Sequence, residues 1–265
     1  MNIDLSGKNA FVMGASKGIG KSVAVALANL GANVTLVART ETTLMQGLID
    51  LSFTSKADQA HDYLVADVSN SEKLKATIEK HLLKSNKSYH IIVNNAGGPP
   101  AGKITEAKED EFLSAFTNHL VANHIITNLL LPGMKKNNYG RIINIISTSV
   151  KAPLHNLGVS NTIRAAVGNW SKTMANELGE FGITVNNVLP GATQTERLTQ
   201  IIENKATKLG IATDIVAEEM KKEIPMARFA KPEEVANAVA FLASPAASYI
   251  NGINLPVDGG RTPCL

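Results

Sequence analysis

Short, uniformly apolar runs alternate along the chain with longer stretches in which apolar residues recur every three or four positions. The short runs predict strands, because a strand that is buried on both faces has no polar side. The longer stretches predict helices that bury one face. Predicted strands span residues 9–13, 33–38, 61–66, 90–93, 141–146, 184–189 and 250–257, and predicted helices span residues 19–30, 71–83, 108–134, 161–178, 196–223 and 232–242.

This order of strands and helices predicts the fold class. Apolar strands that alternate with helices are typical of a parallel sheet that helices cover on both faces. We therefore expect an α/β protein with a doubly wound, parallel, seven-stranded sheet. No linker rich in Pro, Gly or Ser interrupts the 265 residues, so residues 1–265 are expected to form a single domain.

A glycine-rich segment, Gly14–Gly20, joins the first predicted strand to the first predicted helix and reads GASKGIG. Glycines allow a tight turn there and let backbone N–H groups approach a pyrophosphate. The N-terminus of the helix that follows favours the negative charge of the phosphates. The sequence therefore predicts a dinucleotide site at this turn.

The residues after the second predicted strand indicate which dinucleotide binds. Proteins that bind NAD place an acidic residue there, which bonds the ribose 2′-hydroxyl. Here the strand is followed by Arg39 and Thr40, and Lys17 adds a second cation inside the glycine turn. A guanidinium binds a 2′-phosphate bidentately, so the expected cofactor is NADP(H). The alternative is that Arg39 and Lys17 are solvated surface cations.

Several motifs together resemble the short-chain dehydrogenase/reductase family over nearly the whole chain. They are Gly14–Gly20, Asp67-Val68, Asn94–Gly97, Pro190-Gly191 followed by Thr195, and Val257–Gly260. The resemblance implies a Rossmann fold, and within the family the chain looks most like β-ketoacyl-[acyl-carrier-protein] reductases. With the charge pattern, it places cofactor contacts at Gly14, Ser16, Lys17, Gly18, Ile19, Gly20, Arg39, Thr40, Asp67, Val68, Asn95, Ala96, Gly97, Arg164, Pro190, Gly191, Thr193 and Thr195.

Three of the four catalytic positions of that family carry other residues here. In the family, Tyr gives the proton to the substrate oxygen, Lys lowers the pKa of that Tyr and holds the ribose, Ser orients the carbonyl, and Asn supports a water relay. Ser147 matches the Ser, whereas Ser160 stands at the Tyr position and Arg164 at the Lys position. His119 falls at the Asn position, although Asn118 and Asn123 are close enough for a shifted alignment.

These replacements leave two functions open. A serine hydroxyl is a far poorer acid than a tyrosine, whose reference pKa is near 10. As an NADP(H)-dependent oxidoreductase acting on a carbonyl/alcohol pair, the chain would orient the carbonyl with Ser147 and hold the ribose with Arg164. The proton would come from a water at Ser160, or from His119. Without turnover, the chain would instead be an NADP(H)-binding sensor or scaffold.

Residues 196–226 correspond to the variable substrate lid of the family. Apolar residues and four lysines alternate there, which would suit an acyl chain on an acidic carrier; the alternative is an amphipathic helix with a solvated face. The expected substrate is a small carbonyl compound or an acyl thioester. His155 follows Ser147 in a loop that substrate would approach, unless it is an ordinary loop residue. The family also implies a homo-oligomer, a tetramer.

Composition and charge exclude other classes. The net charge of +3 is too small and too scattered to indicate a nucleic-acid partner. Cys264 is the one cysteine, and Cys/His clusters are absent, so neither a disulfide framework nor a metal site is expected. No charged segment followed by an apolar run begins the chain, and no apolar stretch would span a bilayer. We expect a cytoplasmic protein without membrane contact.

Overall fold

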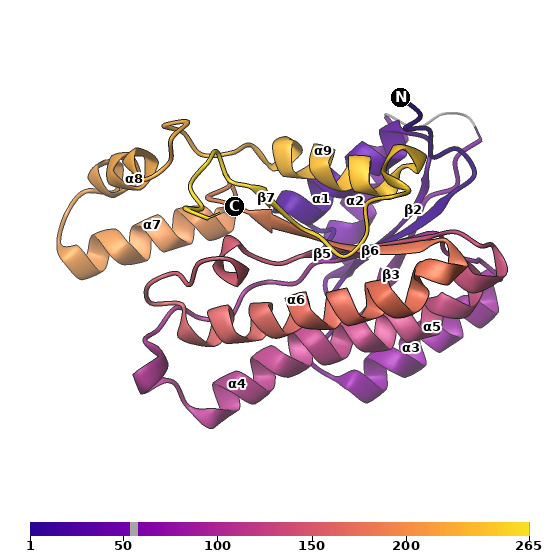
Figure 1. Cartoon of the computed structure of the whole chain (residues 1–265), viewed down its shortest axis with the longest axis horizontal. Coiled ribbons are helices and arrows are strands. Elements are labelled where there is room, and N and C mark those ends of the chain that lie inside the picture. Colours follow the sequence, from indigo (N-terminus) through magenta and orange to yellow (C-terminus); the bar gives the residue numbers. More distant parts are fainter. Residues whose placement is uncertain (54–57, 265) are drawn as a thin grey trace.

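The computed structural model describes residues 1–53 and 58–264, and within them seven strands form one sheet (Figure 1). The strands are β1 (Asn9–Met13), β2 (Asn33–Ala38), β3 (Asp62–Val65), β4 (Ile91–Asn94), β5 (Gly140–Ile145), β6 (Ile183–Pro190) and β7 (Asn254–Val257). Every neighbouring pair is parallel, in the order β3-β2-β1-β4-β5-β6-β7. The predicted doubly wound α/β fold is confirmed.

Helices cover both faces of the sheet. They are α1 (Gly18–Asn29), α2 (Glu41–Ser52), α3 (Ser71–Ser85), α4 (Glu109–Phe116), α5 (Ala122–Lys136), α6 (Gly158–Leu178), α7 (Glu196–Leu209), α8 (Thr213–Lys222) and α9 (Pro232–Ala243). Helices α1, α2 and α9 lie on one face, and α3, α5 and α6 lie on the other (Figure 1). Helices α7 and α8 extend beyond the body of the molecule.

Each face of the sheet packs against its own layer of helices and forms a separate apolar core. In β1, Ala10 and Val12 pack into the core beneath α1 and α9, while Phe11 and Met13 pack into the core formed with α3, α5 and α6. Successive side chains of a strand point to opposite faces, so a strand between two helical layers must be apolar at every position. This requirement explains the uniform apolar runs in the sequence.

Helix α2 was absent from the predicted elements. Its sequence contains Thr42, Thr43 and Gly47, which are weak helix formers. The tertiary structure compensates by packing: Leu44 and Leu51 are fully buried, and a Cβ at Gly47 would lie only 2.9 Å from Leu36 Cδ1. Close packing of the helix against β2 therefore outweighs its weak local propensity.

Three predicted elements differ from the structure by more than a shift of one to three residues at an end. The helix expected over 108–134 contains a π-helical turn at Thr117–Val121, which separates α4 from α5. The helix expected over 196–223 is two helices, with Gly210 capping the end of α7. The last strand begins at Asn254 rather than at residue 250, because residues 250–253 bond to β6 as irregular backbone.

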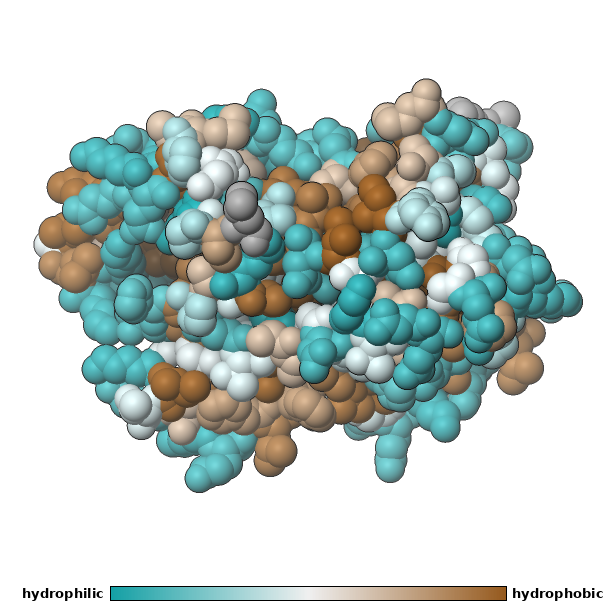
Figure 2. Space-filling model, viewed as in Figure 1, coloured by the Kyte–Doolittle hydropathy of each residue, from teal (hydrophilic) through white to brown (hydrophobic). Residues whose placement is uncertain are grey.

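The carboxyl ends of the parallel strands meet at one edge of the sheet, where ligands of open α/β folds bind. The glycine turn follows β1, Arg39 follows β2, Asn95 follows β4, and Ser147 follows β5. The space-filling view shows hydrophobic residues at the outer end of α7 and α8, where Leu209 and Ile215 are half exposed (Figure 2). Among the described residues, no helix has the length and apolarity needed to cross a membrane.

Candidate active site

The glycine turn is packed so closely that two of its residues have no room for a side chain. Gly14 has a φ of +61°, and a Cβ there would lie 2.7 Å from Asn95 Nδ2. A Cβ at Gly20 would lie 2.1 Å from the Gly14 carbonyl oxygen and also 2.7 Å from Asn95 Nδ2. Bare backbone therefore lines the turn, and the end of β4 supports it from below.

The residues after β6 close the other side of this turn. Thr195 is the N-cap of α7 and accepts a hydrogen bond from the Leu198 N–H at 3.4 Å. Its Cγ2 would lie 3.2 Å from a Cβ at Gly18, so the glycine turn and the start of α7 are in contact. Gly191 donates its N–H to the Val257 carbonyl at 2.9 Å, and the Thr193 hydroxyl lies 3.1 Å from the Gly191 carbonyl. Half-buried Pro190 ends β6 just before this segment.

The two cations expected at the 2′-phosphate differ in their surroundings. Lys17 is exposed and forms an ion pair with Glu196 in the first turn of α7. Arg39 is exposed at the end of β2, beside Thr40, the N-cap of α2. Of the two, only Lys17 has its charge paired with a carboxylate among the residues that the structure describes.

Asp67 lies in reach of the Arg39 charge and has a well-defined orientation. It accepts a hydrogen bond from the Ser69 N–H at 3.0 Å. That hydrogen bond is the main cause of the lowered pKa of the Asp67 carboxyl, and the Arg39 charge contributes in the same direction. Asp67 and the half-buried Val68 follow β3, so they lie at the same sheet edge as Arg39.

Arg164 is a buried cation at the centre of the candidate site. Only 7% of its surface is exposed. From α6, its Nη1 donates to the Ile145 carbonyl at 2.9 Å, and its Nη2 donates to the Ala96 carbonyl at 3.5 Å. Burial lowers its pKa to about 10, so the guanidinium remains protonated at neutral pH. The side chain therefore joins the ends of β4 and β5.

His119 lies beside this guanidinium, because the π-helical turn places it in the interior. The ring is 3% exposed and is hydrogen-bonded with the backbone of Gly97. Burial first, and then the positive charge of Arg164, lower its pKa to about 3, while the Gly97 bond acts in the opposite direction. The imidazole is consequently neutral at physiological pH. The structure thus brings together His119, Arg164 and the turn after β4.

Two serines complete the predicted catalytic set. Ser147 Oγ accepts a hydrogen bond from the Ser149 N–H at 3.1 Å, so its own proton is available to a ligand. Ser160 is half buried in the first turn of α6, one turn before Arg164. Asn118 is half buried in the π-helical turn and Asn123 in α5, and it is His119 whose pKa Arg164 perturbs.

A row of four buried or half-buried asparagines crosses the sheet just below the site, and sequence reasoning missed it. Asn94, Asn144, Asn187 and Asn254 are register partners on β4, β5, β6 and β7. Asn94 Nδ2 donates to Asn144 Oδ1 at 2.8 Å, Asn144 Nδ2 donates to Asn187 Oδ1 at 3.0 Å, and Asn187 Nδ2 donates to Asn254 Oδ1 at 2.8 Å. The detectable signal is an asparagine inside three of the predicted strands and directly after the fourth, the strand predicted over 90–93.

Two hollows border the site. One, of about 390 Å³, is lined by Gly102, Lys103, Ile104, Thr105, Leu154, His155, Asn156, Gly158 and Asn161. The other, of about 400 Å³, is lined by Gln194, Thr195, Glu196, Leu198, Thr199, Ile202 and Phe229. His155 therefore lies at the rim of a hollow beside the first turn of α6, and the base of α7 borders the second hollow.

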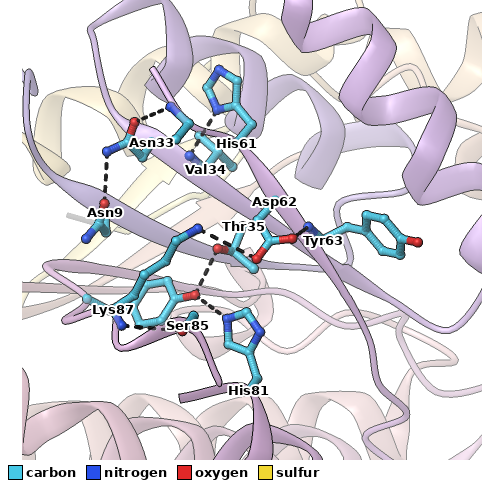
Figure 3. A network of polar contacts seen from close by, with 12 residues as sticks. Asn9, Asn33, Val34, Thr35, His61, Asp62, Tyr63, His81, Ser85 and Lys87 are labelled. Carbon is cyan, nitrogen blue, oxygen red and sulfur yellow. Dashed lines mark hydrogen bonds and ion pairs between the residues drawn. The ribbon is translucent and has the colours of Figure 1, made fainter. Parts of the chain in front are cut away.

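A second polar cluster lies at the opposite, amino-terminal edge of the sheet (Figure 3). The hydroxyl of Tyr89 lies 2.8 Å from Thr35 Oγ1 and 2.7 Å from His81 Nε2. His61 Nδ1 accepts a hydrogen bond from the Val34 N–H at 3.1 Å. Because the glycine turn and Arg164 lie at the carboxyl ends of the strands, this cluster is separate from the candidate active site.

Comparison with known proteins gives consistent matches over nearly the full length. A family model described as Enoyl-(Acyl carrier protein) reductase matches residues 14–262. The 3-oxoacyl-[acyl-carrier-protein] reductase FabG of Pseudomonas aeruginosa is 35% identical over 261 residues, which cover 97% of this chain and 98% of that protein. The NADPH-dependent reductase BacG of Bacillus subtilis is 32% identical over 256 residues, with 97% and 98% covered.

Solved structures agree with these relatives. YwfH, an NADPH dependent reductase involved in Bacilysin biosynthesis, superposes with a TM-score of 0.92 at 31% identity and covers 98% of this chain and 100% of its own. L-sorbose reductase from Gluconobacter frateurii, complexed with NADPH and L-sorbose, has a TM-score of 0.93 at 30% identity, with both chains covered completely. The match in sequence, in strand order and at the glycine turn shows that this chain belongs to the short-chain dehydrogenase/reductase family.

Proposed function

We propose that the protein is an NADP(H)-dependent reductase of a carbonyl substrate, either a 3-oxoacyl thioester or another small carbonyl compound. The observation that carries the proposal is the closely packed glycine turn, in which a Cβ at Gly14 or Gly20 would collide with Asn95. Such a turn is useful where backbone must approach a pyrophosphate. Relatives named as NADPH-dependent reductases support the same cofactor.

The residues present fit NADP(H) in charge as well as in shape. Arg39 is exposed at the end of β2 and is free of any carboxylate ion pair within residues 1–53 and 58–264, so it would bind the 2′-phosphate. Thr195 borders the glycine turn and would hold the carboxamide end of the cofactor, as in the family. Arg164 would hold the ribose, the role of the family Lys.

When bound, NADPH supplies a hydride to the carbonyl carbon. Ser147 orients the substrate, because its hydroxyl proton is available to the carbonyl oxygen while its oxygen accepts the Ser149 N–H. The low pKa of His119 argues against an imidazolium as the acid. We therefore assign the proton to a water held by Ser160, and the positive field of Arg164 stabilises the hydroxide that remains.

Residues 196–226 are proposed to close over the substrate as a lid. They form α7 and α8, which pack on each other and on the following segment through Leu198, Ile224 and Phe229. The hollow at the base of α7 and the hollow near His155 are the open space that a substrate would enter. Because this buried cluster is small, we propose that α7 and α8 are attached to the rest of the molecule mainly at one end, as a lid requires.

The test is a single-turnover experiment in which protein and NADPH are mixed in stoichiometric amounts and the NADPH absorbance is recorded. The substrates are a 3-oxoacyl thioester and a broad panel of small ketones. Substrate-dependent oxidation is expected, at a rate well below that of a tyrosine-based enzyme, because a positioned acid contributes about 10²–10⁴-fold. Ser160→Ala should slow it further. Thr162→Ala, which removes a hydroxyl from the exposed face of α6, should not. No oxidation across the panel, with NADPH bound, would refute the proposal.

A second candidate function is a non-catalytic NADP(H) sensor or scaffold. It is favoured by Arg164, whose Nη1 and Nη2 groups are engaged by backbone carbonyls of β5 and of the turn after β4. If the chain is a sensor, the double substitution Ser160→Tyr with Arg164→Lys should create reductase activity where none exists. If the double substitution lowers an activity that is already present, the sensor function is excluded.

A further inference from the structure

An acidic side chain stands close to the position proposed for the 2′-phosphate. Arg39 and Thr40 follow β2, and Glu41 is the first residue of α2. A chain spans at most about 3.6 Å per residue, so the Cα atom of Glu41 lies no more than about 7 Å from that of Arg39. All three residues are exposed. The cation proposed to bind the phosphate therefore has a carboxylate as a near neighbour in the chain.

That carboxylate is bound to a tyrosine and not to the arginine. The Tyr63 hydroxyl donates a hydrogen bond to Glu41 Oε1 at 2.8 Å. This bond is the main cause of the raised pKa of the Tyr63 hydroxyl, so the phenol keeps its proton at neutral pH and remains the donor. In the described part of the chain, Arg39 forms no ion pair with a carboxylate. The Glu41 carboxylate is thus engaged, and the charge of Arg39 is left for a ligand.

The sheet determines where the Tyr63 hydroxyl can reach. Tyr63 lies on β3 and is the register partner of Leu36 on β2, so both side chains point to the same face of the sheet. Both pack into the apolar core that α1, α2 and α9 cover. Figure 3 shows the Tyr63 ring directed away from the polar cluster at the amino-terminal edge. Packing therefore holds the half-buried ring, and its hydroxyl meets the first turn of α2.

A released Glu41 carboxylate would oppose the binding of a 2′-phosphate in two ways. It would pair with Arg39 and so weaken the attraction of the guanidinium for the phosphate, and it would repel the phosphate directly. Proteins that bind NAD place an acidic residue at the end of this same strand, where it bonds the 2′-hydroxyl. The preference for one dinucleotide over the other therefore depends on where the Glu41 carboxylate is held.

We propose that Tyr63 is a specificity-determining residue of the cofactor site: by holding the carboxylate of Glu41, it keeps that charge away from the 2′-phosphate and preserves a preference for NADP(H) over NAD(H). The inference rests on the proposed function for the position of the 2′-phosphate, and on the Tyr63–Glu41 hydrogen bond for the control of the charge. Tyr63 acts through Glu41 and does not itself need to touch the cofactor.

The test measures the dissociation constants of NADH and NADPH, which differ only in the 2′-phosphate, by fluorescence titration of the full chain at low salt. Tyr63→Phe removes the hydroxyl and keeps the packed ring. The ratio of the NADH constant to the NADPH constant should fall by about threefold or more, within the range expected for exposed charge pairs. The fall should come from weaker NADPH binding. An unchanged ratio, or equal weakening of both cofactors, would overturn the proposal.

Substitution of Glu41 shows whether its charge is responsible. In the Tyr63→Phe background, Glu41→Gln should restore the ratio, because the released side chain is then neutral. With Tyr63 in place, the same substitution should change the ratio less, so the two effects are not additive. Tyr249→Phe is the matched control, since Tyr249 is fully exposed just before β7, at the opposite edge of the sheet from β3. If Glu41→Gln does not restore the ratio, Tyr63 acts through packing alone and the inference is wrong.

The outcomes also separate this inference from the proposed function, and none of them requires turnover. A preference for NADPH in the unmodified protein that survives Tyr63→Phe would retain the proposed cofactor and refute the inference. Equal binding of NADH and NADPH by the unmodified protein would refute NADP(H) as the cofactor, and the inference with it.

Discussion

Lys17 and Glu196 are 179 residues apart in sequence, yet their ion pair joins the glycine turn to the first turn of α7. Both side chains are about two-thirds exposed, at 67% and 66%. An exposed pair of this kind contributes little to stability. The pair matters more for ligand binding, because the Glu196 carboxylate offsets the charge of Lys17, which would otherwise attract a phosphate.

We therefore predict that Glu196→Gln tightens the binding of NADPH. Removing the negative charge frees Lys17 for the 2′-phosphate, and the gain should be up to about fivefold, in line with the 0.2–1 kcal/mol typical of exposed pairs. NADH, which has no 2′-phosphate, should bind as before. Fluorescence titrations of both cofactors at low and high salt measure this, and equal changes for the two cofactors would contradict it.

At the scale of elements, the turn between β1 and α1 depends on the absence of side chains. Gly20→Ala places a Cβ 2.1 Å from the Gly14 carbonyl oxygen, which forces the turn to shift. We predict at least a tenfold loss of NADPH affinity, about 1.4 kcal/mol or more, in the same titration. Gly133→Ala in α5 is the control, since its Cβ would come no closer than 3.4 Å to any atom. Its NADPH affinity should match that of the unmodified protein.

The asparagine row links four strands through their side chains. Asn144 lies at its centre, fully buried, and also donates to Ser171 Oγ at 2.9 Å. Asn144→Ala leaves Asn94 Nδ2 without its partner, whereas Asn187 Oδ1 still accepts a hydrogen bond from the Ser171 hydroxyl at 2.7 Å. A buried unsatisfied group costs about 1–3 kcal/mol, so urea unfolding should show a loss of about that size. Asn128→Ala, on the exposed face of α5, should change it by no more than about 0.5 kcal/mol.

At the scale of the whole molecule, buried and half-buried histidines make stability depend on pH. Burial is the main cause of the lowered pKa values of His61, His81 and His90 in the amino-terminal part of the sheet, and of His119 at the site. The folded protein therefore binds fewer protons than the unfolded chain below the ordinary histidine pKa of 6.5. Stability is full above pH 6.5 and falls as the pH falls toward the folded pKa values.

We predict that the free energy of unfolding is lower at pH 5 than at pH 7. His119, with its folded pKa of about 3, alone accounts for about 2 kcal/mol of this loss. Protonation would also remove the Nδ1 acceptors that bind the N–H groups of Val34 and Asn9. Urea unfolding between pH 5 and 8 measures the slope, and His119→Asn should reduce it. A stability that is constant across this range would contradict the assignment of neutral buried rings.

The sequence by itself determined the strands, the glycine turn and the residues at the strand ends, because each of these depends on local requirements of the backbone. An all-parallel sheet requires strands that are apolar on both faces, so the apolar runs of the sequence predict the strands and their alternation with helices. A tight strand-to-helix turn requires glycine, so the turn at Gly14–Gly20 was readable as well. The residues at the ends of the strands followed, because parallel strands bring their carboxyl ends to one edge.

The tertiary structure decided everything that depends on burial or on contacts between distant segments. Helix α2 exists because Leu44 and Leu51 are buried, although Thr42, Thr43 and Gly47 within it are weak helix formers. The charge of His119 could not be read from its identity, since its pKa of about 3 results from burial and from Arg164, which lies 45 residues further along the chain. The burial of Arg164, which hydrogen-bonds to the carbonyls of Ile145 and Ala96, is likewise a property of packing that its identity alone does not reveal.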